Sequence, residues 1–205
     1  MSLISNSLQL NDINLNDIDE KLSMIPFNTI TLAGVPKRLL NVVKEMFKSV
    51  KDRIEEGEAY LTVHTKDIKP METHRRGGPH IDGNYIKEIC NWGSGGGNGW
   101  KVGENGRKLS TEHHKLSYET QTGGMLIASS HPACLGWNGI FDEKAKEGGD
   151  CSHIQNLNLK GQFLMKPNKV YYGTSQFIHE SIPVEKEVKR TLIRITLPLT
   201  QKYLN

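Results

Sequence analysis

The clearest periodic pattern in the chain lies between Pro36 and Glu56. Apolar residues recur there at spacings of three and four, at Leu39, Val43, Met46, Val50 and Ile54. This spacing places their side chains on one face of a helix, so the pattern predicts an amphipathic helix over 36–56 that packs on a sheet. Gly57 suits its end.

Most other apolar segments are short and rich in β-branched and aromatic residues, which is typical of strands. We predict strands at 60–63, 125–127, 170–172, 177–179 and 190–197. In the last of these, Arg190, Leu192 and Arg194 share one face, because side chains alternate along a strand. Residues 1–25 have no long periodicity and are predicted to be a lead-in with one helical turn.

A polar, glycine-rich stretch at 93–122 interrupts the predicted strands. It is long for a structureless connection, and such loops are often lids or binding loops. We interpret it as an inserted loop, which either folds over a substrate, with Trp92 or Trp100 as anchors, or is a simple excursion. The expected organisation is one domain, with a lead-in and helix at 1–58 and a mainly β core at 59–200.

Composition is that of a soluble globular protein, with 36% hydrophobic and 24% charged residues among 205. No run of 18 or more apolar residues and no basic segment followed by an apolar stretch is present, so we expect a cytoplasmic protein without a membrane span. Cys90, Cys134 and Cys151 lack a C-x-x-C spacing, which argues against a disulfide framework or a zinc ribbon.

Candidate chemistry begins with His80 and Asp82, in the run Gly-Gly-Pro-His-Ile-Asp-Gly. With 8 histidines and 23 acidic residues in the chain, chance alone predicts roughly one such pair. The flanking glycines and proline make the pair a stronger candidate for a functional site. They predict a strand end beside a loop, where functional residues concentrate. On a strand, both side chains would point to the same face.

His179 and two arginines complete the pattern. A distant second histidine would give two nitrogens and one carboxylate on one side of a metal, as in non-haem iron oxygenases. Arg190 and Arg194 are costly to bury without anionic partners, and a planar guanidinium suits a carboxylate.

These residues resemble a known family, the Fe(II)- and 2-oxoglutarate-dependent oxygenases of the double-stranded β-helix fold. The likeness covers roughly residues 60–199. It implies a jelly-roll core of the cupin kind, iron held by His80, Asp82 and His179, and 2-oxoglutarate held by Arg190, with Arg194 as a second cosubstrate arginine. It also implies O2 as cosubstrate and hydroxylation of a substrate, with release of succinate and CO2.

The substrate does not follow from the resemblance. Lys66, Lys69, His74, Arg75 and Arg76 precede the proposed ligands and would form either a positive rim for an anionic substrate or ordinary solvated charge. Arg76, Tyr85 and Trp92 are the candidate substrate-binding residues. A protein side chain, a nucleobase and a small metabolite all stay open, as does the oligomeric state.

A second interpretation is a cupin-like barrel that binds metal without 2-oxoglutarate. In that protein the arginines would pair with Glu180, Glu185 or Glu187 instead of a cosubstrate. His64 has no neighbour at a ligand spacing, and we interpret it as a surface or structural residue.

Overall fold

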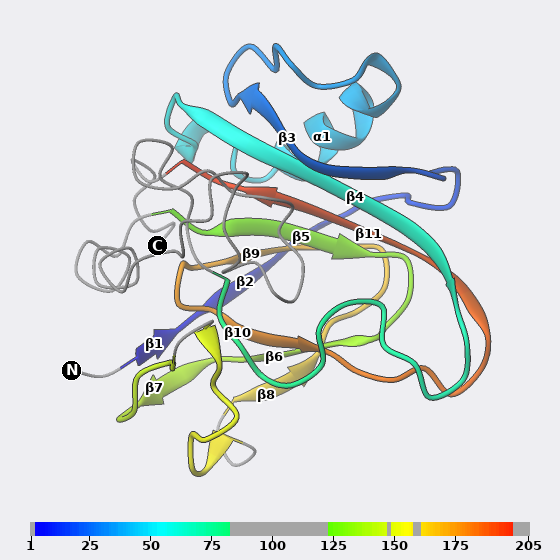
Figure 1. Ribbon diagram of the computed structural model, residues 1–205. Coiled ribbons are helices and arrows are strands. Elements are labelled where there is room, and N and C mark those ends of the chain that lie inside the picture. Colours follow the sequence, from blue (N-terminus) through cyan, green and yellow to red (C-terminus); the bar gives the residue numbers. More distant parts are fainter. Residues whose placement is uncertain (1–2, 83–122, 147–148, 158–160, 199–205) are drawn as a thin grey trace, which may run out of the picture.

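A computed structural model describes residues 3–82, 123–146, 149–157 and 161–198. This part of the chain is mainly β-structure, with antiparallel sheets and one short α-helix (Figure 1). The largest sheet has six strands in the order β2-β9-β5-β11-β4-β3. These strands are β2 (Ser7–Asp12), β9 (Lys169–Gly173), β5 (Met125–Ser129), β11 (Val188–Thr196), β4 (Glu58–Ile68) and β3 (Lys21–Asn28).

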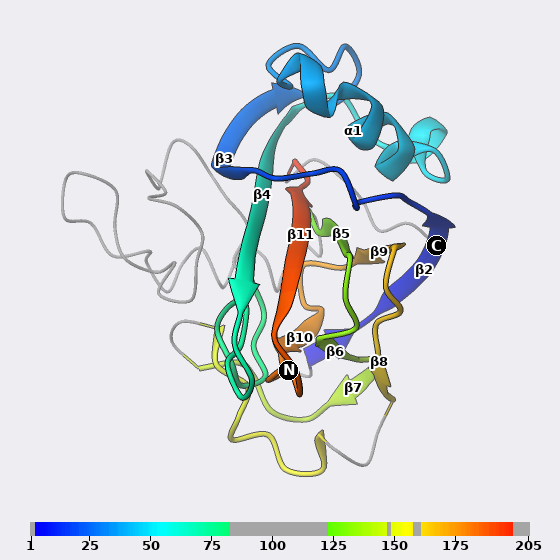
Figure 2. The same cartoon turned by 90° about the vertical axis from the view of Figure 1, so that its right-hand side faces the viewer.

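Two smaller sheets accompany the large one. One has the order β10-β6-β8, and β1 pairs with β7 in the other. Their strands are β10 (Ile178–Ser181), β6 (Cys134–Trp137), β8 (Gln162–Leu164), β1 (Leu3–Ser5) and β7 (Gly139–Phe141). The large sheet lies between α1 (Leu40–Phe47) on one side and the β10-β6-β8 sheet on the other, as the two views show (Figures 1 and 2).

β11 shows why the large sheet is covered on both faces. Ile193 and Ile195 have no exposed surface and belong to the apolar cluster that includes α1. The alternate residues face the other way, and there Leu192 joins a second apolar cluster with Cys134 from β6 and Phe177 just before β10. Because side chains alternate along a strand, one strand contributes to two layers of core.

The predicted helix over 36–56 is wrong in its length. The segment consists of the 3-10 turn η1 (Lys37–Leu39), α1, and the 3-10 turn η2 (Lys51–Arg53). The helical path breaks at Val50, whose φ of −132° lies outside the helical region. The predicted apolar stripe is nevertheless buried, since Leu39, Val43, Met46, Val50 and Ile54 all belong to the core.

The predicted lead-in at 1–25 is also wrong, because this segment forms β1, β2 and the first half of β3. β2 pairs with β9 and β3 pairs with β4, each with an irregularity in its register. The backbone hydrogen bonds of these pairings hold the segment in strands, which its polar, Asn- and Asp-rich sequence does not predict. Leu3 and Leu15 are fully buried, which fixes the segment to the fold.

The strands predicted in the β core are confirmed as β4, β5, β9, β10 and β11, although β4 runs further than expected. The strand prediction at 177–179 matches β10 to within a residue at its start. The inserted loop at 93–122, with Trp92 and Trp100, lies outside the described residues. Among the described helices, none has the length and apolar character needed to cross a membrane.

Candidate metal centre

His80 and His179 are held next to each other by the backbone. The amide of His80 donates to the carbonyl of His179 at 3.0 Å, and the amide of His179 donates back to the carbonyl of His80 at 2.9 Å. This reciprocal pair is a β-bridge, and it brings the two imidazole rings to a centroid distance of 4.7 Å. Two histidines far apart in the sequence therefore lie side by side.

The segment around His80 is fixed from its other side as well. The Ile81 amide donates to the Gly149 carbonyl, and the Cys151 amide donates to the Pro79 carbonyl, each at 2.9 Å. The segment is thus clamped between β10 and residues 149–151. This differs from the expected strand, since His80 forms isolated bridges only.

Asp82 completes a cluster with the two histidines. One potential ligand atom from each of His80, Asp82 and His179 lies within 4.8 Å of the others. His80 and His179 are buried, and the Asp82 side chain is 28% exposed. The three residues that the sequence singled out are thus brought together, and they could hold a metal ion.

Both imidazoles are oriented as metal ligands usually are. Nδ1 of His80 lies 2.7 Å from the carbonyl oxygen of Gly78, and Nδ1 of His179 lies 3.1 Å from that of Phe177. A proton on each Nδ1 satisfies these carbonyls and leaves the lone pair of each Nε2 available for a cation. Such hydrogen bonds fix the ring and its tautomer in metal sites.

The charges of the cluster also suit a cation. Burial, and then the neighbouring His179, lowers the pKa of His80 to about 4, so this imidazole is neutral near pH 7. Burial alone would raise the pKa of Asp82, but Arg194 and the two histidines outweigh it and hold that pKa well below its usual value. The donor set near neutral pH is therefore one neutral imidazole from His80 and one carboxylate, with the second imidazole from His179 beside them.

Arg194 lies against the cluster. Its Nη1 donates to Oδ2 of Asp82, which fixes the carboxylate and balances its charge. The expected contact of Arg194 with a cosubstrate stays a prediction. The structure places this arginine beside the metal-ligand carboxylate instead of among apolar neighbours.

Arg190 lies four residues before Arg194 on the same face of β11, and it is fully buried. Its guanidinium donates to Oγ of Ser129 at 2.8 Å and to Oγ of Ser181 at 3.2 Å. A third contact, at 2.9 Å, is with Sγ of Cys134. These partners are all neutral, so among the described residues no carboxylate is bonded to this buried charge.

Of the three candidate substrate-binding residues, one lies within the described part of the chain. Arg76 is half-buried near the cluster, and its carbonyl accepts a hydrogen bond from the Ser181 amide at 3.4 Å. Tyr85 and Trp92 lie outside the described residues. Their predicted roles stay predictions.

Sequence reasoning missed the location of one histidine. His74 is predicted to be part of a positive rim or ordinary solvated charge, but it is only 3% exposed. Its ring packs on that of His64 at 4.9 Å, which agrees with a structural role for His64. Thr62, His64 and Lys66 alternate along β4, a pattern that signals one polar strand face. Only the pairing of β4 with β11 places that face beside the arginines.

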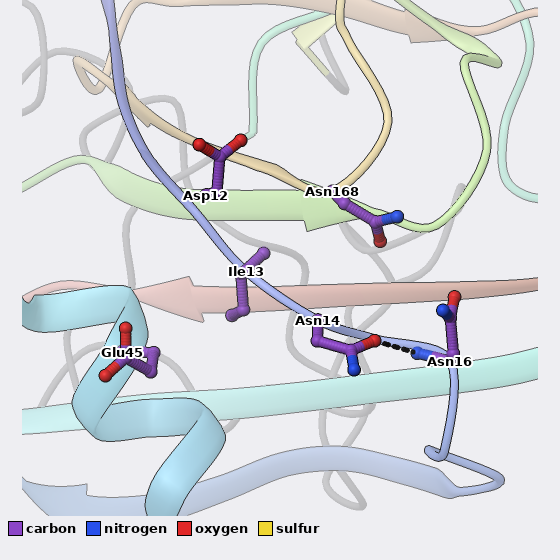
Figure 3. Close-up of a pocket in the computed structure, with 6 residues that line it drawn as sticks. All are labelled: Asp12, Ile13, Asn14, Asn16, Glu45 and Asn168. Atoms are coloured by element: carbon purple, nitrogen blue, oxygen red, sulfur yellow. Dashed lines mark hydrogen bonds between the residues drawn. The ribbon is translucent and has the colours of Figure 1, made fainter.

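A pocket of about 510 Å³ lies elsewhere, near the end of β2. Figure 3 shows the residues that line it, which are Asp12, Ile13, Asn14, Asn16, Glu45 and Asn168. It shares no residue with the metal cluster, and Asp12 is paired with Nζ of Lys169 at 2.7 Å. We therefore do not consider it the functional site.

Comparisons with family models, curated proteins and solved structures found no match to this chain. Its function is therefore argued from the site.

Proposed function

We propose that the protein is an Fe(II)- and 2-oxoglutarate-dependent dioxygenase that hydroxylates its substrate and releases succinate and CO2. The observation that carries this proposal is a His-Asp-His cluster in the same interior as a fully buried arginine with neutral partners. The cluster suits a metal, and the arginine suits an anion.

The donor set fits Fe(II). Two imidazole nitrogens and one carboxylate oxygen leave coordination positions open, as a metal that binds both a cosubstrate and O2 requires. The buried free thiols of Cys134 and Cys151 do not belong to the cluster, which argues against a thiolate site for zinc. Their reduced state also suits the cytoplasm, where we place the protein.

Arg190 fits the distal carboxylate of 2-oxoglutarate. Burying a guanidinium with only neutral partners is unfavourable, and a bound carboxylate would offset that cost with charge-assisted hydrogen bonds. In the competing protein, a cupin-like barrel that only binds metal, Arg190 would pair with an acidic residue of its own chain. Its contacts with Ser129 and Ser181 favour the oxygenase.

The strand order supports a double-stranded β-helix for this protein. β9, β5, β11 and β4 are consecutive in the large sheet, and β10, β6 and β8 are consecutive in the facing sheet. The His80 segment bridges the free edge of β10 and so extends the facing sheet. We infer an arrangement of four strands of the large sheet against three strands and the bridged His80 segment, with the metal ligands at the edge where that segment lies.

In this proposal each residue has a definite role. His80, Asp82 and His179 would hold the iron, which supplies O2 activation coupled to decarboxylation of the cosubstrate. Arg190 would bind and orient 2-oxoglutarate. Arg194 would hold the carboxylate of Asp82 in place. Arg76 would contact the substrate, and an anionic substrate would suit its charge.

The test is an anaerobic titration of Fe(II)-loaded protein with 2-oxoglutarate. Chelation of the 2-oxo acid should produce a weak visible absorption band near roughly 500 nm. Arg190→Met, which keeps an unbranched side chain in place of the aliphatic part of arginine and removes the charge, should lose the band at the same cosubstrate concentration while it still binds metal. Iron bound without any band in the wild-type protein would contradict the proposal and favour the metal-binding barrel.

A further inference from the structure

His74 is a buried polar side chain without a hydrogen-bond partner among the described residues. It is 3% exposed, and neither ring nitrogen is hydrogen-bonded to any atom in that part of the chain. A buried donor without a hydrogen bond costs about 1–3 kcal/mol, so unpaired donors are rare in the interiors of native proteins. A bound ligand with an acceptor atom would satisfy this donor.

The backbone on both sides of His74 is tied to the surroundings of Arg190. On one side, Nζ of Lys66 donates to the carbonyl of Thr73 at 3.3 Å, and Lys66 is the register partner of Arg190. On the other side, the Arg75 amide donates to Oγ of Ser181 at 3.4 Å. The same hydroxyl accepts from Nη1 of Arg190 at 3.2 Å. His74 is therefore held beside the Arg190 guanidinium.

The charges around His74 indicate which kind of ligand its ring would bind. Burial, and then Arg190, lowers the pKa of His74 to about 3, so the ring is neutral near pH 7 and carries one N–H donor. The further causes of this shift are the positive Lys66 and Arg75 and the neighbouring His64. A cation would be repelled here, whereas an anion would be attracted by the arginine and bonded by the imidazole.

We propose that His74 and Arg190 bind the same anionic group, the distal carboxylate of the cosubstrate, and that His74 sets the preference for a dicarboxylic 2-oxo acid. This inference rests on the function proposed above. Arg190 supplies charge, and the neutral ring supplies a directional donor. Ring packing against His64, at 4.9 Å, holds the imidazole in place.

The experiment measures binding by calorimetry to protein loaded with Mn(II), which does not turn the cosubstrate over. The two probes are 2-oxoglutarate and 2-oxobutyrate, which lacks the distal carboxylate. In His74→Phe, the Kd for 2-oxoglutarate should rise about tenfold, as for loss of one hydrogen bond to a charged group, and the Kd for 2-oxobutyrate should stay unchanged. His74→Gln, which keeps a donor, should recover part of the affinity.

Two controls separate the outcomes. Mn(II) affinity should be the same in wild-type and variant proteins, which shows that the fold and metal cluster are intact. His153→Phe changes a histidine that bonds instead to the Lys144 carbonyl, and it should leave both Kd values unchanged. An unchanged Kd for 2-oxoglutarate in His74→Phe, or equal weakening of both probes, would overturn the inference. Failure of the wild-type protein to bind 2-oxoglutarate would overturn the proposed function itself.

Discussion

At the scale of single residues, the interior of this protein combines buried histidines of lowered pKa with a buried arginine. His80 and His74 are both kept neutral, chiefly by burial. Arg190, in contrast, keeps its charge because a guanidinium is not deprotonated in proteins. The neutral rings can act as ligand and donor, while the arginine attracts an anion.

The depressed pKa of His74 predicts a dependence of stability on pH. In the unfolded chain, the His74 ring takes up a proton as the pH falls below its ordinary pKa of 6.5. In the folded protein, the same ring takes up a proton only near pH 3. Between these values the unfolded state binds more protons, so the stability present above pH 6.5 is lost as the pH falls. From pH 7 to pH 5, the wild-type protein should lose about 2 kcal/mol more of its unfolding free energy than His74→Gln.

Urea unfolding of both proteins at the two pH values would measure this difference. His80 also has a lowered pKa, but it is present in both proteins and cancels in the comparison. Parallel pH profiles would mean that the His74 ring finds a partner or solvent in the folded protein.

At the scale of elements, the site depends on the close approach of the backbone at Gly149 to the backbone at Ile81. Gly149 has a φ of +72°, and a Cβ there would lie 2.1 Å from the carbonyl oxygen of Ile81, the residue between the two metal ligands. Glycine is therefore required both for the conformation and for the space. The contact holds the His80 segment against residues 149–151.

Gly149→Ala should therefore displace this segment, lower the unfolding free energy by about 2 kcal/mol, and weaken Mn(II) binding. The matched control is Gly77→Ala, where the nearest atoms to a Cβ are 3.8 Å away and the glycine is exposed. That change should stay within about 0.5 kcal/mol of wild type. Chemical denaturation and calorimetric Mn(II) titration give both readouts, and full Mn(II) affinity in Gly149→Ala would contradict the role of the clamp.

The elements also show what the sequence could predict. β9 and β11 were predictable because β-branched and aromatic residues dominate them. The His80 segment was predicted as a strand end, but it is held by bridges to His179 and Asp150 that no local pattern encodes. The helix was predicted too long, since its apolar spacing continues through Val50 although the backbone does not.

At the scale of the whole molecule, strand pairing decides which residues meet. Asp82, His179 and Arg190 come from separate segments, and their residue types and order pointed to a shared site before their positions were known. The neighbours of Arg190 were not predictable in this way. Ser129 and Ser181 reach it only because β5 and β10 lie near β11, and His74 reaches it through a loop whose contacts are tertiary.

Because the metal cluster joins segments distant in the chain, metal binding should stabilise the fold as a whole. A ligand that binds only the folded state adds about 2.7 kcal/mol at a concentration one hundred times its Kd. For a chain of this size, that corresponds to a rise in Tm of about 7 °C. We expect Mn(II) to produce this rise in scanning calorimetry, and a chelator to reverse it.

The variants decide whether the rise comes from the proposed cluster. His179→Ala removes one imidazole at the bridge but leaves its backbone hydrogen bonds with His80, which are made by main-chain atoms. It should therefore fold, yet show no rise in Tm with Mn(II), whereas His153→Ala should behave like the wild-type protein. An equal rise in His179→Ala would place the metal elsewhere, and the cluster would then be only a hydrogen-bonded junction between the two sheets.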